Sequence, residues 1–303
     1  MAYNCIVLIK QVPDTKKITG EAMNEDGTVN RSALPAIFNP EDLNALELAL
    51  QIKEKFGGKV TVMTMGLPAA AAVLRDSFFR GADEAVLITD RKCAASDTLA
   101  TSYIISCAVK KLDYDIVLCG RQAIDGDTAQ VGPQLAEKLG IPQITYVEEL
   151  IALNGESIAV QRNIGTGWQR VKARLPVLLT VTGDANEPRV PAAKKMMKYK
   201  KARTAFEIEQ RLKAENPDAD QQTIQDLLDH KCSLLEENGL LIKQWDLDFI
   251  GADLNWCGRD GSPTKVHRIQ SVVLTAKESR DIQPTEKGIS DMIGELIKDK
   301  TIS

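Results

Sequence analysis

Residues 120–133, GRQAIDGDTAQVGP, combine glycines with small polar side chains between two less polar segments. The run at 115–119 before them is expected to form a buried strand, and 134–140 after them a short amphipathic helix. Glycine lets the backbone approach a phosphate closely, and the first amides of a helix favour an anion. The three glycines of this segment are Gly120, Gly126 and Gly132. The pattern predicts a nucleotide site at the end of a parallel strand, with an ordinary strand-to-helix turn as the alternative.

Side chains suited to acid–base or metal chemistry are scarce. The chain has two histidines and shows neither an HExxH motif nor a Ser-His-Asp set. Its six cysteines have no CxxC spacing, and most of those in apolar runs are expected to be small buried side chains. His230 and Cys232 are close in sequence, but one further histidine is too few for a zinc shell. We expect no metal site, and a bound cofactor that carries the chemistry.

The bulk composition is that of an ordinary globular protein. At 303 residues the chain is long enough for about two domains. A formal net charge of −4 argues against a nucleic-acid partner. No apolar run approaches the roughly 20 residues that span a bilayer, and the run at 5–9 is too short for a secretion signal and is closed by Lys10. We expect a cytoplasmic protein without a membrane span.

The elements that must position the loop alternate between strand and helix over the first 140 residues. Apolar runs predict strands at 3–9, 59–65, 84–88 and 115–119. Helical patterns and start signals predict helices at 40–54, 69–79, 98–111 and 134–140. Repeated strand–helix units imply an α/β fold, a Rossmann-like, doubly wound, mostly parallel sheet.

From residue 143 the pattern changes to strands joined by tight turns. Strands are expected at 143–153, 157–162, 167–173 and 176–181, with Asn154-Gly155 as a hairpin turn. We interpret them as an antiparallel extension of the same domain. Because Pro188 marks a break, the expected division is a nucleotide-binding α/β domain at 1–188 and an extended C-terminal arm at 189–303.

The arm begins with a basic segment at 194–203, in which six of ten residues are Lys or Arg and two are Met. It is either a solvated arm or a segment that docks on a partner. Residues 204–240 are predicted as a polar helical insertion of two helices. The rest is poor in large apolar residues, and we expect it to wrap over the first domain or over another chain, ending in a helix at about 284–299.

Several ordered segments resemble one known family, the small (beta) subunit of electron transfer flavoproteins. The matching segments are 7–14, 38–40, 65–66, 120–133, 175–178, 186–189, 194–203, 250–253, 257–258 and 261–264. Together they extend over nearly the whole chain except about 204–240. The resemblance implies a heterodimer with a larger alpha subunit, and an adenine nucleotide at the carboxyl ends of the parallel strands.

The resemblance also bears on which nucleotide is bound. Respiratory members hold AMP as a structural ligand. Electron-bifurcating members, typical of anaerobic metabolism, hold a second FAD that takes a hydride from NADH and divides the electrons between ferredoxin and the alpha-subunit FAD. Residues 96–102 and 125–133 resemble the bifurcating pattern, so FAD is favoured over AMP. The expected electron acceptor is a flavin-dependent dehydrogenase or reductase, such as an acyl-CoA dehydrogenase type or a 2-hydroxy-acid dehydrogenase.

Matching motif to motif gives a set of cofactor-binding residues and no acid or base. They are Leu8, Asn39, Met65, Gly66, Asp97, Thr98, Thr101, Gly120, Arg121, Gln122, Ala123, Asp125, Gly126, Asp127, Thr128, Ala129, Gln130 and Val131. The first four are expected to line the adenosine pocket, and the threonines to donate to a diphosphate. The two aspartates of the loop are expected to cap the next helix or to meet ribose hydroxyls. Arg121 or Gln122 is expected near the flavin or its phosphates, with a surface ion pair as the alternative for Arg121.

Two departures from the family pattern affect the expected partner. Family members commonly carry a leucine just after the segment at 186–189, where this chain has Ala192-Ala193-Lys194-Lys195. The insertion at 204–240 is also unusual, and it is either a contact for a dedicated dehydrogenase or neighbouring subunit, or a solvated decoration. A nucleotide-sensing domain of the universal-stress type is a further alternative, but its ATP-type phosphate loop, GxxxxGK[ST], is absent.

Overall fold

The computed structural model describes residues 1–14, 34–265 and 281–298, and in this part of the chain ten strands form one sheet. They are β1 (Cys5–Leu8), β4 (Val60–Met65), β5 (Glu84–Ile88), β6 (Ile116–Gly120), β7 (Gln143–Asn154), β8 (Ser157–Asn163), β9 (Trp168–Arg174), β10 (Val177–Val181), β11 (Arg203–Thr204) and β12 (Leu241–Trp245). The order across the sheet is β11-β12-β5-β4-β1-β6-β10-β7-β8-β9. A separate antiparallel pair, β2 (Gln11–Pro13) with β3 (Ala36–Phe38), lies beyond the end of β1.

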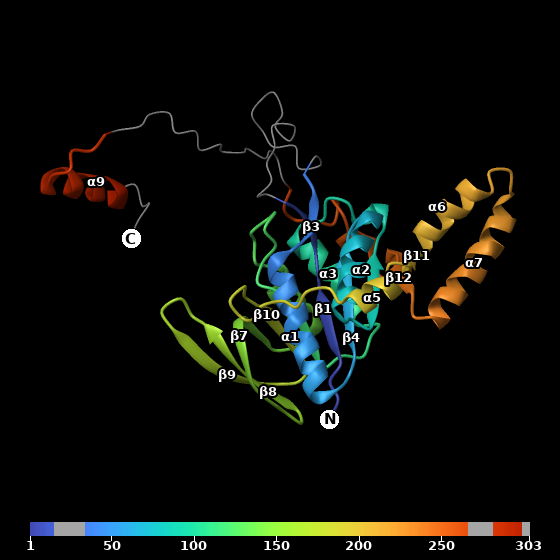
Figure 1. Cartoon of the computed structure of the whole chain (residues 1–303), viewed down its shortest axis with the longest axis horizontal. Helices are drawn as coiled ribbons and strands as arrows, with labels where there is room; N and C mark the ends of the chain where they lie inside the picture. The colour runs from blue at the N-terminus through green and yellow to red at the C-terminus, as the bar shows by residue number, and fades with distance from the viewer. Residues whose placement is uncertain (15–33, 266–280, 299–303) are drawn as a thin grey trace.

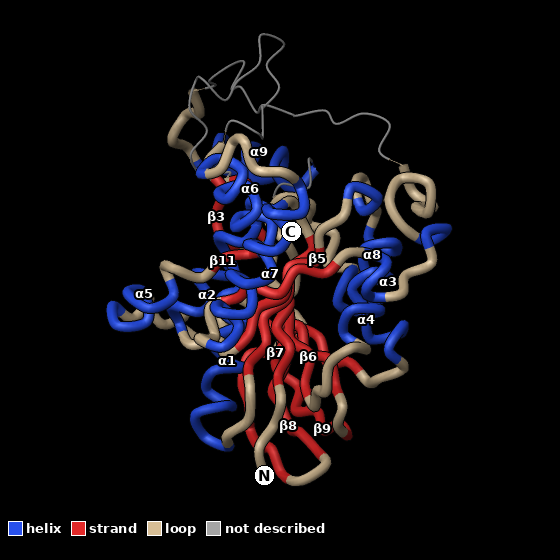
Figure 2. Tube along the Cα trace, turned by 90° about the vertical axis from the view of Figure 1, so that its right-hand side faces the viewer, coloured by secondary structure: helices blue, strands red, loops and turns tan. Residues whose placement is uncertain are grey.

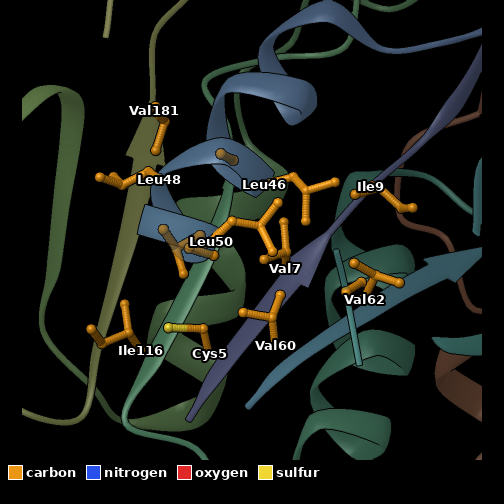
Figure 3. Close-up of a cluster of buried hydrophobic side chains, with 14 of the residues drawn as sticks. Cys5, Val7, Ile9, Leu46, Leu48, Leu50, Val60, Val62, Ile116 and Val181 are labelled. Atoms are coloured by element: carbon orange, nitrogen blue, oxygen red, sulfur yellow. The ribbon is translucent and has the colours of Figure 1, made fainter. Parts of the chain in front are cut away.

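Helices cover both faces of the sheet, which confirms the α/β, Rossmann-like prediction. On one face lie α1 (Pro40–Phe56) and α2 (Ala71–Arg80), and on the other α3 (Thr98–Val109), α4 (Val131–Leu139) and α8 (Leu247–Ile250), as Figure 2 shows. Each face has its own buried cluster. Figure 3 shows the first of these, in which Leu46 and Leu50 of α1 meet Val7 of β1.

The central strands are continuous apolar runs because helices bury them on both sides. All four residues of β1 and all five of β10 are buried. The helices begin at the signals present in the sequence: Pro40 stands in the first turn of α1, and the Asp97 carboxylate caps the Ala100 amide at the start of α3. The positions and types of these elements follow the predicted pattern within a few residues.

The strand at 177–181 lies elsewhere than predicted. β7, β8 and β9 form an antiparallel meander, which appears in green at the lower left of Figure 1. β10, expected to belong to this extension, instead pairs parallel with both β6 and β7. The reason is burial: β10 is apolar at four of its five positions and has no polar face to turn to solvent, so it takes an interior place in the parallel sheet.

The arm returns to the sheet after residue 188. Helix α5 (Ala193–Tyr199) packs on α2, where the rings of Tyr199 and Phe78 stack with centroids 4.8 Å apart. Helices α6 (Ala205–Glu215) and α7 (Gln221–Glu237) form a hairpin with a small cluster of its own, and it projects to the right in Figure 1. β11 and β12 flank this hairpin and extend the sheet beside β5. The predicted division at residue 188 remains an expectation.

The later part of the arm lies on α3. Trp245, Leu247, Ile250 and Cys257 join the buried cluster on that face of the sheet, so this stretch covers the first domain, one of the two expected outcomes. Short 3-10 turns occur at Pro68–Ala70, Arg91–Cys93 and Leu254–Trp256. The final helix is α9 (Glu286–Lys298), and its isoleucines are about half exposed. No described helix has the length and apolar character needed to cross a bilayer.

Candidate nucleotide site at the ends of strands β1 and β6

The topology places the predicted site at the point where the strand order reverses. From β1 the chain proceeds to β4 and β5 on one side, and then to β6 and β10 on the other side of β1. Leu8, Met65 and Gly120 therefore end three neighbouring parallel strands, β1, β4 and β6. The crevice outside the carboxyl ends at such a switch point is where open α/β sheets bind their ligands.

Three side chains at the start of α1, which we call the clamp, hold the backbone that follows β6. Asp42 accepts hydrogen bonds from the Lys10 amide at 2.8 Å and the Gly120 amide at 2.9 Å, so it joins the ends of β1 and β6. Glu41 accepts from the Gln122 amide at 3.0 Å. Asn39 accepts from the Ile124 amide at 3.1 Å and donates to the Gln122 carbonyl at 2.9 Å. Because of these contacts, residues 120–124 keep a fixed path.

The Asp42 side chain is buried, and this shifts its pKa. Burial raises the pKa of Asp42 to about 7, although the hydrogen bonds from the Gly120 amide, Asn39 and the Lys10 amide act in the opposite direction. The protonation of this clamp residue therefore changes near neutral pH.

The loop beyond the clamp has an unusual backbone. Asp127 and Ala129 have φ angles of 48° and 54°, in the left-handed region that residues other than glycine seldom adopt. Such conformations concentrate at ligand sites. Lys10 forms an ion pair with Asp125 at 2.8 Å, and Gln122 donates to Asp127 at 3.1 Å. The Gln130 side chain, at the N-cap of α4, makes no capping hydrogen bond. The capping and ribose roles of the two aspartates stay predictions.

A second helix start faces this loop. Thr98, the first residue of α3, donates from its hydroxyl to Gln130 Oε1 at 2.9 Å, just before α4 begins. Gln134 Nε2 donates to the Thr98 hydroxyl at 3.4 Å. Gln134 Oε1 is buried and has no hydrogen-bond partner among the described residues. Thr101 lies one turn further along α3 and is half-buried. The structure therefore brings together the two helix starts that the sequence associates with a diphosphate.

The three glycines of the loop have different surroundings. A Cβ atom at Gly120 would lie 2.6 Å from Asp42 Oδ1, and one at Gly132 would lie 2.9 Å from Cys119 Sγ. Packing within the protein thus accounts for these two glycines. A Cβ at Gly126 would meet nothing within 4 Å. Of the three, only Gly126 is open for the close approach of a ligand.

The predicted adenosine residues lie on the same edge of the sheet. Leu8 is buried at the end of β1, Met65 is half-buried at the end of β4, and the Gly66 amide donates to the Ile88 carbonyl at 3.0 Å. Asn39 is fully buried, and both polar groups of its side chain are bound to the loop. Asn39 therefore positions the loop in this structure. The remaining residues of the predicted set lie in the loop before α4 or at its first residue and are at least partly exposed: Ala123, Thr128, Ala129, Gln130 and Val131.

Arg121 lines a polar cavity of about 820 Å³, together with Tyr146 and Arg162 among others. Its Nη2 pairs with Glu41 at 2.9 Å, as in the ion-pair alternative, and its guanidinium group lies 5.6 Å from the centre of the Tyr146 ring. The Nε atoms of both arginines are buried and have no hydrogen-bond partner within the described ranges. The guanidinium groups of both arginines give this cavity positive charge, beside the carboxylate of Glu41.

Sequence reasoning missed several residues that build the site. Glu41 and Asp42 were visible as acidic residues in the first turn of a helix, but nothing local connects them to a loop about eighty residues away. Tyr146 and Arg162 belong to strands whose register was not predictable. One signal in the sequence pointed to Glu41 and Asp42: acidic residues fall on the side of α1 that the helical pattern predicts to be buried. A carboxylate on a buried face requires a hydrogen-bond or charged partner.

Comparison with known proteins agrees with this geometry. The family model described as the electron transfer flavoprotein domain matches residues 26–210. The chain belongs to the electron transfer flavoprotein family. A family member from Clostridium acetobutylicum, an electron transfer flavoprotein subunit beta, is 38% identical over 293 residues, which cover 97% of each chain.

Two further relatives within the electron transfer flavoprotein family have a higher identity over a shorter aligned length. The subunit beta of Thermoanaerobacterium thermosaccharolyticum is 50% identical over 191 residues, 63% of this chain and 72% of the relative. Subunit CarD of the caffeyl-CoA reductase-Etf complex of Acetobacterium woodii is 46% identical over 186 residues, 61% of this chain and 70% of that subunit.

Proposed function

We propose that this chain is the beta subunit of a heterodimeric electron transfer flavoprotein that binds FAD between β1 and β6 and takes electrons from NADH. When bound, this FAD supplies the chemistry: it accepts a hydride and passes single electrons to ferredoxin and to the FAD of the alpha subunit. The alpha subunit then serves a partner dehydrogenase or reductase. Family membership and the beta-subunit relatives support the electron-transfer role.

One observation carries the preference for FAD: the starts of α3 and α4 meet at the hydrogen bond between Thr98 and Gln130. A helix start presents backbone amides that lack acceptors within the helix. Two such starts, with a left-handed loop between them, offer converging donors to a diphosphate. The single phosphate of AMP requires fewer donors. AMP as a structural ligand is the alternative, because its adenosine would use the same strand ends.

The described residues fit a dinucleotide in their donors and acceptors. Gln134 Oε1 and the Nε atoms of Arg121 and Arg162 are buried polar atoms without partners in the described part of the chain, and such atoms favour a bound polar group. Gly126 leaves room beside the backbone. In this proposal the clamp orients the loop, Thr98 and Thr101 donate to phosphates, and Arg121 supplies a positive charge that favours a reduced, anionic flavin.

The segment at 189–203 is the proposed contact for the partner dehydrogenase or reductase. Arg189 anchors its beginning through ion pairs to Glu47, at 2.7 Å, and to Glu54. Val190 is 81% exposed and Met197 of α5 is 64% exposed, beside several exposed lysines. These apolar side chains take the place of the leucine of other members in this proposal. The relative CarD is named for a caffeyl-CoA reductase complex, which supports a reductase partner of this kind.

The test is a count of flavins in the co-expressed heterodimer with its alpha subunit. We expect two FAD per heterodimer, and loss of flavin absorbance when NADH is added without oxygen. Nucleotides released by denaturation are identified by chromatography and mass. One FAD together with one AMP would replace this proposal by the AMP alternative. Two FAD without reduction by NADH would remove the proposed donor but keep the cofactor.

A further inference from the structure

Residues 257–264, which we call the strap, lie against the start of α3 although they are some 160 residues away in sequence. The Gly258 amide donates to the Ser96 hydroxyl at 3.1 Å. The Asp97 amide donates to the Ser262 hydroxyl at 2.8 Å. The Thr264 amide donates to Asp97 Oδ2 at 3.0 Å, and the Thr264 hydroxyl donates to the same oxygen. The strap therefore meets the residues just before α3 from both of its ends.

The strap is fitted closely to the protein. Ser262 is 4% exposed, and its hydroxyl donates to the Gly258 carbonyl at 2.6 Å. Gly258 has a φ angle of 63°, and a Cβ atom there would lie 2.2 Å from the Lys92 carbonyl oxygen. Cys257 is buried in the cluster between α3 and the sheet. A side chain at position 258 would therefore push the strap away from the backbone of residue 92.

Both oxygens of Asp97 are engaged by this arrangement. Oδ1 caps the Ala100 amide at 2.9 Å, and Oδ2 receives the two donors of Thr264. Although partial burial raises the pKa of Asp97, these hydrogen bonds outweigh it and hold the pKa below its usual value, so the side chain is a carboxylate at neutral pH. A carboxylate beside a phosphate site is unfavourable unless its charge is directed elsewhere. Thr264 directs it toward the strap.

We propose that Ser262 and Thr264 are positioning residues of the nucleotide site, which hold Asp97 so that the start of α3 presents Thr98 to the phosphates. This inference rests on the proposed function. Without the Thr264 hydroxyl, Asp97 Oδ2 keeps the Thr264 amide but loses one of its two donors, so its charge is held less firmly away from the site, where it repels phosphate. Without the Ser262 hydroxyl, the Asp97 amide loses its acceptor and the first turn of α3 loses its fixed direction.

The test compares Thr264→Val with Thr264→Ser in the heterodimer with the alpha subunit. Valine has the shape of threonine but cannot donate from its side chain, whereas serine keeps the hydroxyl. After removal of bound nucleotide, FAD and AMP are titrated separately by calorimetry. We expect Thr264→Val to weaken binding about fivefold, the value of one ordinary hydrogen bond. Thr264→Ser is expected to bind like the wild type.

A matched control uses another hydrogen bond of the same tail. The Tyr103 hydroxyl accepts from the Asp253 amide at 2.9 Å, away from Asp97. Tyr103→Phe removes this bond, so it is expected to change stability without changing nucleotide affinity. Equal weakening by Tyr103→Phe and Thr264→Val would overturn the inference, because general loosening of the tail would then explain both. Ser262→Ala gives the same test if Thr264→Val does not fold.

The outcomes separate this inference from the proposed function. A wild type that binds nucleotide while Thr264→Val and Ser262→Ala bind equally well overturns the strap alone. A wild type that binds neither FAD nor AMP overturns the proposed function and the strap with it. Weakened binding in both variants, with recovery in Thr264→Ser, supports the strap.

Discussion

At the scale of single residues, Asp42 decides how the loop is held. Its carboxyl group joins the Lys10 amide of one strand end to the Gly120 amide of the next. It is buried, and burial raises its pKa to about 7. An aspartate in an unfolded chain titrates near 3.9. The folded protein therefore binds this proton more tightly than the unfolded chain between about pH 4 and pH 7.

This proton makes stability depend on pH in a defined direction. Because the folded pKa is raised, the contribution of Asp42 is fully present below about pH 4 and is lost as the pH rises through about 7. Asp42→Asn removes the titration and one acceptor, and we expect it to cost about 1–3 kcal/mol at pH 5. The difference between wild type and variant should narrow from pH 5 to pH 8. Urea unfolding at several pH values measures it, and a difference independent of pH would contradict the assignment.

The second prediction concerns the stability of two glycine variants of the loop, one of which serves as the control for the other. Gly132→Ala places a Cβ 2.9 Å from Cys119 Sγ and 3.0 Å from a Thr180 methyl group, and we expect about 1–3 kcal/mol of destabilisation. Gly126→Ala meets no atom within 4 Å, so its stability should stay within about 0.5 kcal/mol of the wild type.

The effects of these two substitutions on nucleotide affinity should differ from their effects on stability. If the ligand backbone approaches Gly126, the alanine there lowers nucleotide affinity although the protein is as stable as before. Thermal unfolding and nucleotide titration of both variants separate the two effects. Unchanged affinity in Gly126→Ala would mean that the ligand passes elsewhere.

At the scale of elements, the α6–α7 hairpin has a small apolar cluster of its own, against which Leu241 of β12 also packs. This cluster is centred on Ile208, Leu212 and Ile224. It carries nine acidic and three basic residues between 205 and 237, so its surface favours a basic protein partner. The capping box at Thr204 and Glu207 starts the hairpin directly from β11.

Removal of this hairpin tests whether it serves a partner. Replacing 205–237 by a flexible linker of about ten residues preserves a crossover between the parallel strands β11 and β12. We expect the heterodimer to keep its nucleotide, because no candidate site residue lies in the hairpin. Affinity for the partner dehydrogenase or reductase should fall. Loss of the nucleotide on deletion would instead make the hairpin part of the site's support.

At the scale of the whole molecule, local patterns were sufficient for most of the longer elements, but they missed the short strands β2, β3, β11 and β12 and did not give the pairing of the strands. The apolar runs and helix starts of the first 140 residues gave the strands and helices within a few positions, because each signal lies in its own element. The place of β10 was not predictable from tight turns nearby, since its partners β6 and β7 are chosen by burial. β11 and β12 are short, and only the assembled sheet shows that they belong to it.

The site divides in the same way. The loop at 120–131 and the start of α3 were predictable, because glycines, threonines and helix caps are local signals. The clamp was not, since Asp42 and Gly120 are 78 residues apart and meet only after β1 and β6 have paired. The strap was visible only as a turn-rich segment, and its contact with Asp97 depends on the arm folding back over α3.

The sheet ends in a strand edge on each side, and an unpaired strand edge is a template for self-association. On one side the edge is β11, which has two residues. On the other side it is β9, seven residues long and largely exposed, with Arg170, Lys172 and Arg174 at alternate positions. A second copy adding its own β9 would bring like charges face to face. This edge therefore disfavours pairing with a second copy of itself, so the row of cations limits aggregation.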